Sequence, residues 1–336
     1  MASELKKETI IYRSGINLSG NEVMTIKKSN FKVIDISVGG DAPKDVVKIY
    51  QYNGKMRKAK PKTWPNYIVK IGQKWYPNES ITEQLLSELG KTIGIQVADT
   101  MLVKMEGMIR LCSRHFHSKD ERLDHGAEIL SRYFDYDDPE WIDDLDNRKE
   151  LKDVIDIEKV IEAIRSVFEE NSQSIMDDFL QMLLFDCFVG NNDRHYYNWG
   201  VIMHIERDHP PIFSPIYDTA RALYWNNPDK FIIDLQADKN YKKERIEKYI
   251  RNSLPKISIP DNSKCNHFEL IGYLYKKGFL QDFHIEFWRN PFILEKVYEC
   301  IDKKFRKLMI PERIKIIKET LELRLYYLQN AIPDVE

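Results

Sequence analysis

Two side chains that bear oxygen atoms lie five residues apart in the segment GNNDRHYYNWG, residues 190–200. They are Asp193 and Asn198, and they follow an apolar run, Phe179 to Phe188, that ends at a Gly-Asn-Asn turn. A loop on such a rigid element can hold functional groups in place. A carboxylate suits proton acceptance, and an amide oxygen suits a hard cation such as Mg²⁺. Taken alone, each residue is more typical of a turn cap.

Three further residues carry charge where the surrounding sequence is apolar. Ile216-Tyr217-Asp218 ends a predicted strand with a carboxylate, which is a second hard oxygen ligand. Lys70 lies in the middle of an otherwise apolar strand that includes Tyr67-Ile68-Val69, and a buried ammonium group there requires an anion. Glu83, on a predicted helix thirteen residues later, is the candidate partner. The alternatives are that Lys70 extends from an edge strand into water and that Glu83 is a surface residue.

Glycine-containing segments supply candidate phosphate-binding loops, because backbone N–H groups at such turns can face phosphate oxygens. The first candidate lies between two predicted strands and consists of Val38, Gly39, Gly40 and Asp41. The second is formed by Ser14-Gly15 and Ser19-Gly20, and both candidates stay open. In either case the elements follow the order of protein kinases: phosphate loop, lysine strand, acidic helix, Asp-to-Asn loop and final carboxylate.

The elements that must position these groups change in character near residue 118. Before it, β-rich runs at 31–36, 46–50, 66–71, 100–105 and 108–112 surround one helix at 80–93. After it, helices are predicted at 121–133, 157–169, 173–188, 240–252, 267–275, 281–287, 291–308 and 311–331, with a hairpin at 198–205 and 211–217. The acidic stretch 134–148 is expected to be a solvated, mobile loop. We therefore expect an α+β protein with two lobes, residues 1–118 and 119–336.

The amino-acid composition favours some classes of protein over others. The chain has 336 residues, of which 43% are hydrophobic, and a formal net charge of -2. This balance predicts a folded protein and gives no general attraction to nucleic acid or anionic membranes. The four cysteines are widely spaced, which argues against a disulfide framework or a CxxC metal site. No apolar stretch suits a signal peptide or a membrane span, so a cytoplasmic protein is expected.

The segments GNNDRHYYNWG and SPIYDTA, together with Lys70 and Glu83, resemble the HipA-like kinases. These are bacterial serine/threonine protein kinases whose fold is related to that of phosphoinositide and eukaryotic protein kinases. The similarity spans about residues 35–330. It implies a two-lobe HipA-like kinase fold with a β-rich N-lobe and an α-rich C-lobe, and ATP and Mg²⁺ as cofactors.

The resemblance also implies a role for each matched residue. Asp193 would be the catalytic base or would orient the acceptor hydroxyl, and Asn198 and Asp218 would bind magnesium. Lys70 would contact the nucleotide phosphates, with Glu83 as its ion-pair partner. The remaining nucleotide-binding positions are a segment at the expected adenine site and one residue that supports the catalytic loop: Arg114, His115, Phe116, His117 and His195.

Some positions depart from the wider kinase pattern. A Gly-x-Gly-x-x-Gly loop is absent from the sequence, and Thr219-Ala220 follows Asp218 where eukaryotic kinases have Phe-Gly. About 36 residues precede Val38, which predicts a compact member without the extra N-terminal subdomain of longer HipA proteins.

The expected function is protein serine/threonine phosphorylation, with autophosphorylation near the phosphate loop and Ser37 as the nearest candidate. The alternatives are a kinase for a lipid or small-molecule hydroxyl and a catalytically silent nucleotide-binding module. The resemblance suggests a toxin of a toxin–antitoxin system or an effector, with a translation factor as substrate and an antitoxin as partner. Direct binding to nucleic acid or membrane is not expected. A bacterial cytoplasmic location is expected, and secretion as an effector is the alternative.

Overall fold

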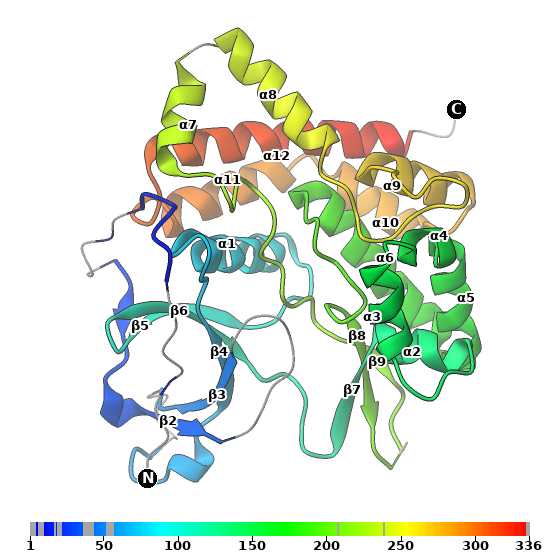
Figure 1. Ribbon diagram of the computed structural model, residues 1–336, viewed down its shortest axis with the longest axis horizontal. Coiled ribbons are helices and arrows are strands. Elements are labelled where there is room, and N and C mark those ends of the chain that lie inside the picture. The colour runs from blue at the N-terminus through cyan, green and yellow to red at the C-terminus, as the bar shows by residue number, and fades with distance from the viewer. Residues whose placement is uncertain are drawn as a thin grey trace.

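The structure, a computed structural model, describes residues 5, 10–16, 18, 22–35, 44–51, 57–206, 208–237 and 239–333. Figure 1 shows a β-sheet on one side of the molecule and a larger body of helices on the other. None of the helices in these ranges is long and apolar enough to cross a membrane. The architecture is therefore α+β, with a sheet-rich lobe and a helical lobe, as the sequence predicts.

The large sheet has six strands in the order β1-β5-β6-β4-β3-β2. Their bounds are β1 Met24–Thr25, β2 Phe31–Ile34, β3 Lys44–Ile49, β4 Asn66–Lys70, β5 Thr100–Met105 and β6 Met108–Arg114. Only β1, which pairs with β5, is parallel to its neighbour. Two short 3₁₀ helices, Lys28–Asn30 and Pro61–Thr63, precede β2 and β4 along the chain.

Alternation along the strands sorts side chains between the two faces of this sheet. Tyr67 and Val69 of β4 are buried in a small apolar core on one face. Because successive side chains of a strand point to opposite faces, Lys70 projects from the other face. Its partner directly across the β3–β4 ladder is Lys44. The two lysines therefore share one face of the sheet.

A single helix, α1 (Asn78–Ile93), covers that face. Its apolar residues Leu85, Leu86 and Leu89 are fully buried. The helix contacts β5, β6 and a later helix, α11 (Ile293–Lys304), so it lies between the sheet and the helical lobe. It ends at Gly94, whose φ of 91° gives the left-handed conformation common at helix C-termini.

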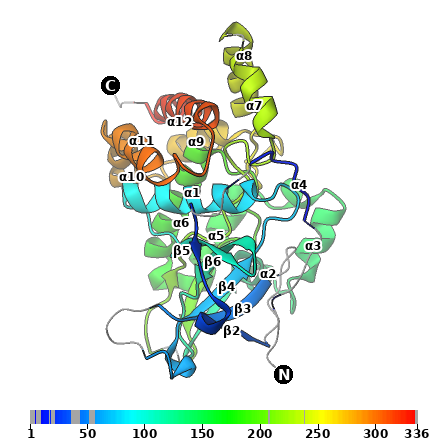
Figure 2. The same ribbon diagram turned by 90° about the vertical axis from the view of Figure 1, so that its left-hand side faces the viewer.

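The helical lobe is built around α6 (Ser172–Val189), whose second half is buried on every side. It packs against α5 (Ile157–Phe168), α9 (His267–Lys276) and α12 (Pro311–Ala331). Around them lie α2 Gly126–Tyr133, α3 Glu140–Asn147, α4 Leu151–Val154, the 3₁₀ helix Glu169–Asn171, α7 Asp229–Gln236, α8 Lys239–Arg251 and α10 Asp282–Arg289. In Figure 2, α7 and α8 extend away from the rest of this lobe.

A second sheet of three strands, β7-β8-β9, lies where the two lobes meet in Figure 1. Its strands are β7 Glu121–His125, β8 Gly200–His204 and β9 Ile212–Phe213. β8 begins two residues after Asn198, and β9 ends five residues before Asp218. The hairpin of β8 and β9 therefore joins the two predicted magnesium ligands.

Some sequence-based predictions of elements were wrong. The predicted helix 121–133 begins only at Gly126, because residues 121–125 pair with β8 as strand β7. The stretch 134–148, expected to be a solvated loop, contains helix α3, whose Ile142 is buried and whose Trp141 stacks on Tyr136. The short helices α4 and α7 and strand β1 were not predicted.

A stability prediction follows from the tight junction between β7 and β8. A Cβ atom at Gly200 would lie closer to the backbone oxygen of Asp124 than van der Waals contact allows. We expect Gly200→Ala to lower the free energy of unfolding by about 1–3 kcal/mol, the usual cost of overpacking. Chemical denaturation measures this change.

The matched control is Gly272→Ala in the interior of α9. Its added methyl group would meet no atom nearer than 3.7 Å. Alanine favours a helix over glycine by roughly 0.5–1 kcal/mol, so this variant should be unchanged or more stable. Equal losses in the two variants would contradict the assigned packing at Gly200.

Candidate active site

Lys70 and Glu83 form an ion pair in the interior between the sheet and α1. Lys70 Nζ lies 2.7 Å from Glu83 Oε1, and the two side chains are 13% and 8% exposed. Glu83 is thus a buried partner of Lys70 rather than a surface residue. Burial raises the pKa of the Glu83 carboxyl above its ordinary value, although Lys70 opposes this shift.

Asp218 joins the same cluster from the other lobe. One carboxylate oxygen, Oδ1, bonds to Lys70 Nζ, and the other, Oδ2, lies 3.0 Å from Lys44 Nζ. Burial favours a neutral Asp218, but Lys70 and Lys44 outweigh it and hold the pKa of Asp218 below its ordinary range. Burial would likewise lower the pKa of Lys70, but Asp218 and Glu83 hold that pKa above its ordinary value.

The backbone around Asp218 is fixed by contacts with both lobes. Ile216 N–H donates to Gln96 O, and Ala98 N–H donates to Ile216 O, which ties this segment to the turn after α1. Asp218 itself has a φ of 54°, a left-handed conformation that Asp adopts more readily than most residues. Tyr217, the preceding residue, donates through its hydroxyl to Tyr197 O at 3.1 Å. These contacts direct the carboxylate of Asp218 toward the lysines.

The predicted catalytic loop begins where α6 ends. Gly190 closes that helix with a φ of 76° and donates to Asp186 O. Asp193 Oδ1 accepts a hydrogen bond from Arg221 Nη1 at 2.9 Å. Asn198 Nδ2 donates to Asp193 O at 2.8 Å, so the amide nitrogen of Asn198 holds the loop and its oxygen is the atom left to bind a cation.

A buried arginine connects this loop to Asp218. Arg194 Nη1 donates to Asn198 O at 2.6 Å and to Tyr217 O at 2.8 Å. Its Nη2 donates to Thr219 Oγ1 at 2.7 Å. The guanidinium also forms a two-pronged ion pair with Asp186 of α6, at 2.7 and 3.0 Å. Arg194 therefore sets the spacing between the Asn198 and Asp218 segments.

The ionisation of Asp193 is set by a partly buried environment with charges of both signs. Burial raises the pKa of its carboxyl, and the nearby Arg221 and Lys256 cations oppose that rise. A carboxylate with a raised pKa is a stronger proton acceptor than one in water. The pKa of the Asp193 carboxyl is thus raised, whereas that of Asp218 is lowered, so the two carboxyls have opposite tendencies to bind a proton.

The residues predicted at the adenine site lie beside this cluster. Arg114 ends β6, and His115 N–H donates to Asn66 O at the start of β4. The Phe116 ring lies 5.6 Å from the ring of Tyr217, the neighbour of Asp218. His115 Nδ1 contacts His117 O at 3.1 Å, and burial lowers the pKa of the His115 imidazole.

His195 lies in the turn of the predicted catalytic loop, where its N–H donates to Asp193 O and its Nδ1 accepts from Tyr197 N–H. The first phosphate-loop candidate, Val38–Asp41, and Ser37 lie outside the described residues. Of the second candidate, Ser14 accepts a hydrogen bond from Asp229 N–H at the start of α7, and Ser19-Gly20 is also outside the described residues. The identity of the phosphate loop stays a prediction.

Sequence reasoning missed four residues of this site. Lys44 carried a signal, since it lies three residues after the first phosphate-loop candidate. Asp186 carried another, because it is a lone carboxylate in the apolar run Leu183–Val189. The roles of Arg194 and Arg221 depend on tertiary contacts that no local pattern reveals.

Comparison with known proteins is consistent with this geometry. The model of the HipA-like C-terminal domain matches residues 36–267, more than half of the chain. The chain therefore belongs to the HipA-like family. A search of curated protein sequences found no match.

Two solved structures share the fold. The proinflammatory kinase CtkA of Helicobacter pylori aligns with a TM-score of 0.67 and 18% identity over 92% of this chain and 98% of its own. HipA of Shewanella oneidensis MR-1, solved with HipB and operator DNA, aligns with a TM-score of 0.53 and 18% identity over 90% of this chain and 67% of its own. Family and fold together define a kinase-type phosphotransferase.

The Asp186–Arg194 pair yields a second stability prediction. Both side chains are almost fully buried, so removing one partner leaves an uncompensated charge. We expect Asp186→Ala to lower the free energy of unfolding by about 3–5 kcal/mol. Urea denaturation of the purified protein measures the loss.

The control is Glu247→Ala, which removes the exposed i,i+4 pair with Arg251 on α8. Such pairs contribute about 0.3–0.5 kcal/mol, so this variant should unfold almost as the wild type does. A loss in Asp186→Ala as small as in Glu247→Ala would show that Arg194 does not depend on Asp186.

Proposed function

We propose that this protein is an ATP- and Mg²⁺-dependent serine/threonine protein kinase. The observation that supports this most strongly is the convergence of Lys70, Lys44 and Asp218 from two lobes, beside a loop that carries Asp193 and Asn198. Cations for phosphates, hard oxygen ligands for a metal and a carboxylate base are the groups that phosphoryl transfer uses.

The residues present suit a bound magnesium nucleotide. Asn198 and Asp218 supply an amide oxygen and a carboxylate of low pKa, both of them ligands that Mg²⁺ prefers. Mg²⁺ bound there would neutralise charge on the β- and γ-phosphates. Lys70 and Lys44 would exchange part of their contact with Asp218 for phosphate oxygens. The segment Arg114–His117 would receive the adenine base, and His195 would support the catalytic loop.

In the proposed reaction, Asp193 accepts the proton of the substrate hydroxyl. The hydroxyl oxygen forms a bond to the γ-phosphorus while the bond between that phosphorus and the β–γ bridging oxygen breaks, and ADP leaves with the bonding electrons. Arg221 holds Asp193 through Oδ1, which leaves Oδ2 for the acceptor hydroxyl. The Arg221 guanidinium lies 5.7 Å from the ring centre of Trp225, a cation–π contact that restrains it.

The finer biological assignments rest on family resemblance. We propose a protein substrate, with a translation factor as the first class to test, and autophosphorylation at a serine near the phosphate loop. The Shewanella HipA structure contains HipB. By analogy, we propose a toxin-type role with a cognate antitoxin as partner, and a bacterial cytoplasmic location.

The decisive test of this proposal separates transfer from binding at Asp193. Asp193→Asn keeps the shape of the side chain but cannot accept the proton. We expect phosphoryl transfer to fall by about 10²–10⁴, the usual contribution of a general base, while affinity for Mg²⁺-ATP stays nearly unchanged. The readouts are incorporation of labelled phosphate into the protein or a protein mixture, and calorimetric nucleotide binding.

The matched control is Asp302→Asn on α11, an exposed carboxylate paired with Lys318. It should leave both transfer and binding as in the wild type. Equal transfer by the wild type and Asp193→Asn at matched nucleotide occupancy would remove Asp193 from the mechanism. Nucleotide binding without transfer by the wild type to any acceptor would favour a silent nucleotide-binding module.

A further inference from the structure

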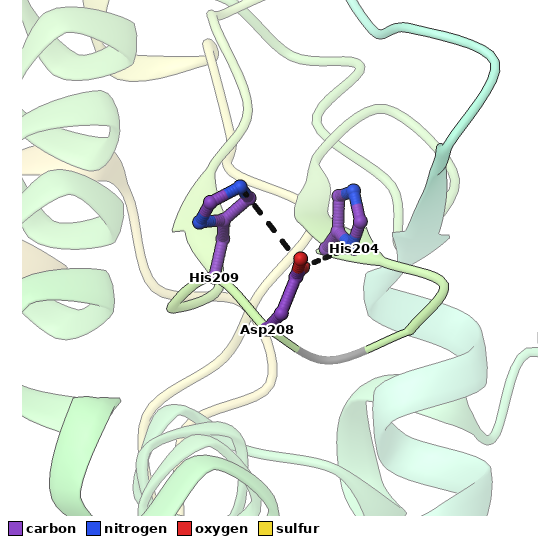
Figure 3. A group of neighbouring side chains, drawn as sticks. All are labelled: His204, Asp208 and His209. Atoms are coloured by element: carbon purple, nitrogen blue, oxygen red, sulfur yellow. Dashed lines mark ion pairs between the residues drawn. The ribbon is translucent and has the colours of Figure 1, made fainter.

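Two histidines and an aspartate meet at the far end of the β8–β9 hairpin, away from Asn198 and Asp218. His204 is the last residue of β8, and Asp208 and His209 lie in the turn that follows. Figure 3 shows that the three side chains converge, with Asp208 between the two imidazoles. One nitrogen or oxygen of each residue lies within 4.8 Å of the others.

The distances are close to those of a metal site. Asp208 Oδ1 lies 2.5 Å from His204 Nδ1 and 4.0 Å from His209 Nε2. Zinc bonds of about 2.0–2.2 Å in tetrahedral geometry place ligand atoms roughly 3.4 Å apart. Small rotations of exposed side chains would bring the three atoms to that spacing, because Asp208 and His209 are 57% and 72% exposed.

The His204 nitrogen is available as a metal ligand. His204 Nδ1 is buried and, among the described residues, makes no hydrogen bond of acceptable geometry, although Asp208 Oδ1 is near. A proton on Nδ1 would make this contact an ion pair, whereas a divalent ion would bind both atoms and His209 Nε2 as well. Glu121 of the neighbouring strand β7, directly opposite His204 in the β7–β8 ladder, adds negative charge beside the hairpin.

We propose that His204, Asp208 and His209 bind one divalent transition-metal ion of the zinc class. Imidazole nitrogens suit Zn²⁺, Ni²⁺ and Co²⁺, whereas Mg²⁺ prefers a set of oxygen ligands. Three protein ligands on an exposed turn leave at least one position for water. The bound ion would join the end of β8 to the turn before β9 and so stiffen the hairpin that carries Asn198 and Asp218. This site does not rest on the proposed kinase activity.

The test is metal binding by the untagged protein in excess Mg²⁺, which occupies oxygen-only sites. We expect calorimetry to show one equivalent of Zn²⁺, and Co²⁺ to give visible absorption bands of a low-symmetry site with nitrogen ligands. His209→Ala should weaken Zn²⁺ binding by at least about 10-fold and remove the Co²⁺ bands. Because the His209 side chain is 72% exposed, this variant should fold, which equal melting temperatures without metal would verify.

The control is Glu299→Ala on α11, which removes an exposed carboxylate that does not belong to the cluster. It should bind Zn²⁺ as the wild type does. The cysteines do not compete for the ion, because all four are buried. Equal Zn²⁺ affinity in the wild type and His209→Ala, or an equal loss in Glu299→Ala, would show that His204 and Asp208 form only an ion pair and would overturn the proposal.

Discussion

The β3–β4 ladder places Lys44 directly opposite Lys70, so two ammonium groups occupy neighbouring positions on one face of the sheet. Like charges in this arrangement destabilise a sheet, and burial increases the cost. Glu83 neutralises one of them from α1, and Asp218 contacts both from the other lobe. The charge balance on this face of the sheet therefore depends on Asp218, a carboxylate from the helical lobe. Nucleotide phosphates bound at this point would also neutralise the two lysines.

The position of Asp218 depends in turn on the core of the helical lobe. Arg194 binds the backbone oxygens of Asn198 and Tyr217, and Asp186 of α6 holds Arg194 in the interior. The second half of α6 is buried on every side, so its position is fixed by packing rather than by solvent-exposed contacts. The apolar core, the catalytic loop and the lysine pair thus form one continuous chain of contacts.

The change of pattern near residue 118 was enough to predict the two-lobe α+β architecture. The Lys70–Glu83 pair was predicted because a lysine in an apolar strand needs an anion, whereas Asp218 was predicted as a magnesium ligand and its contact with Lys70 was not. The helix prediction was wrong at residues 121–125, since their polar pattern suits a helix surface and only pairing with β8 makes them a strand. The sequence also did not predict α3, because this helix is mostly acidic and Ile142 is its one buried residue. Lys44 and Arg221 were not predicted as site residues, because each acquires its role through a tertiary contact. Their partners, Asp218 and Asp193, lie 174 and 28 residues away along the chain. Such contacts follow from topology, which no local window contains.

The most direct test of this account is a crystal structure with Mn²⁺ and a non-hydrolysable ATP analogue, in which anomalous scattering locates the metal. We predict Mn²⁺ bound to the Asn198 amide oxygen and to Asp218, with Lys70 on the phosphates and still paired with Glu83. A nucleotide bound elsewhere, or Asp218 that keeps both lysine contacts while the metal lies apart from it, would contradict the account.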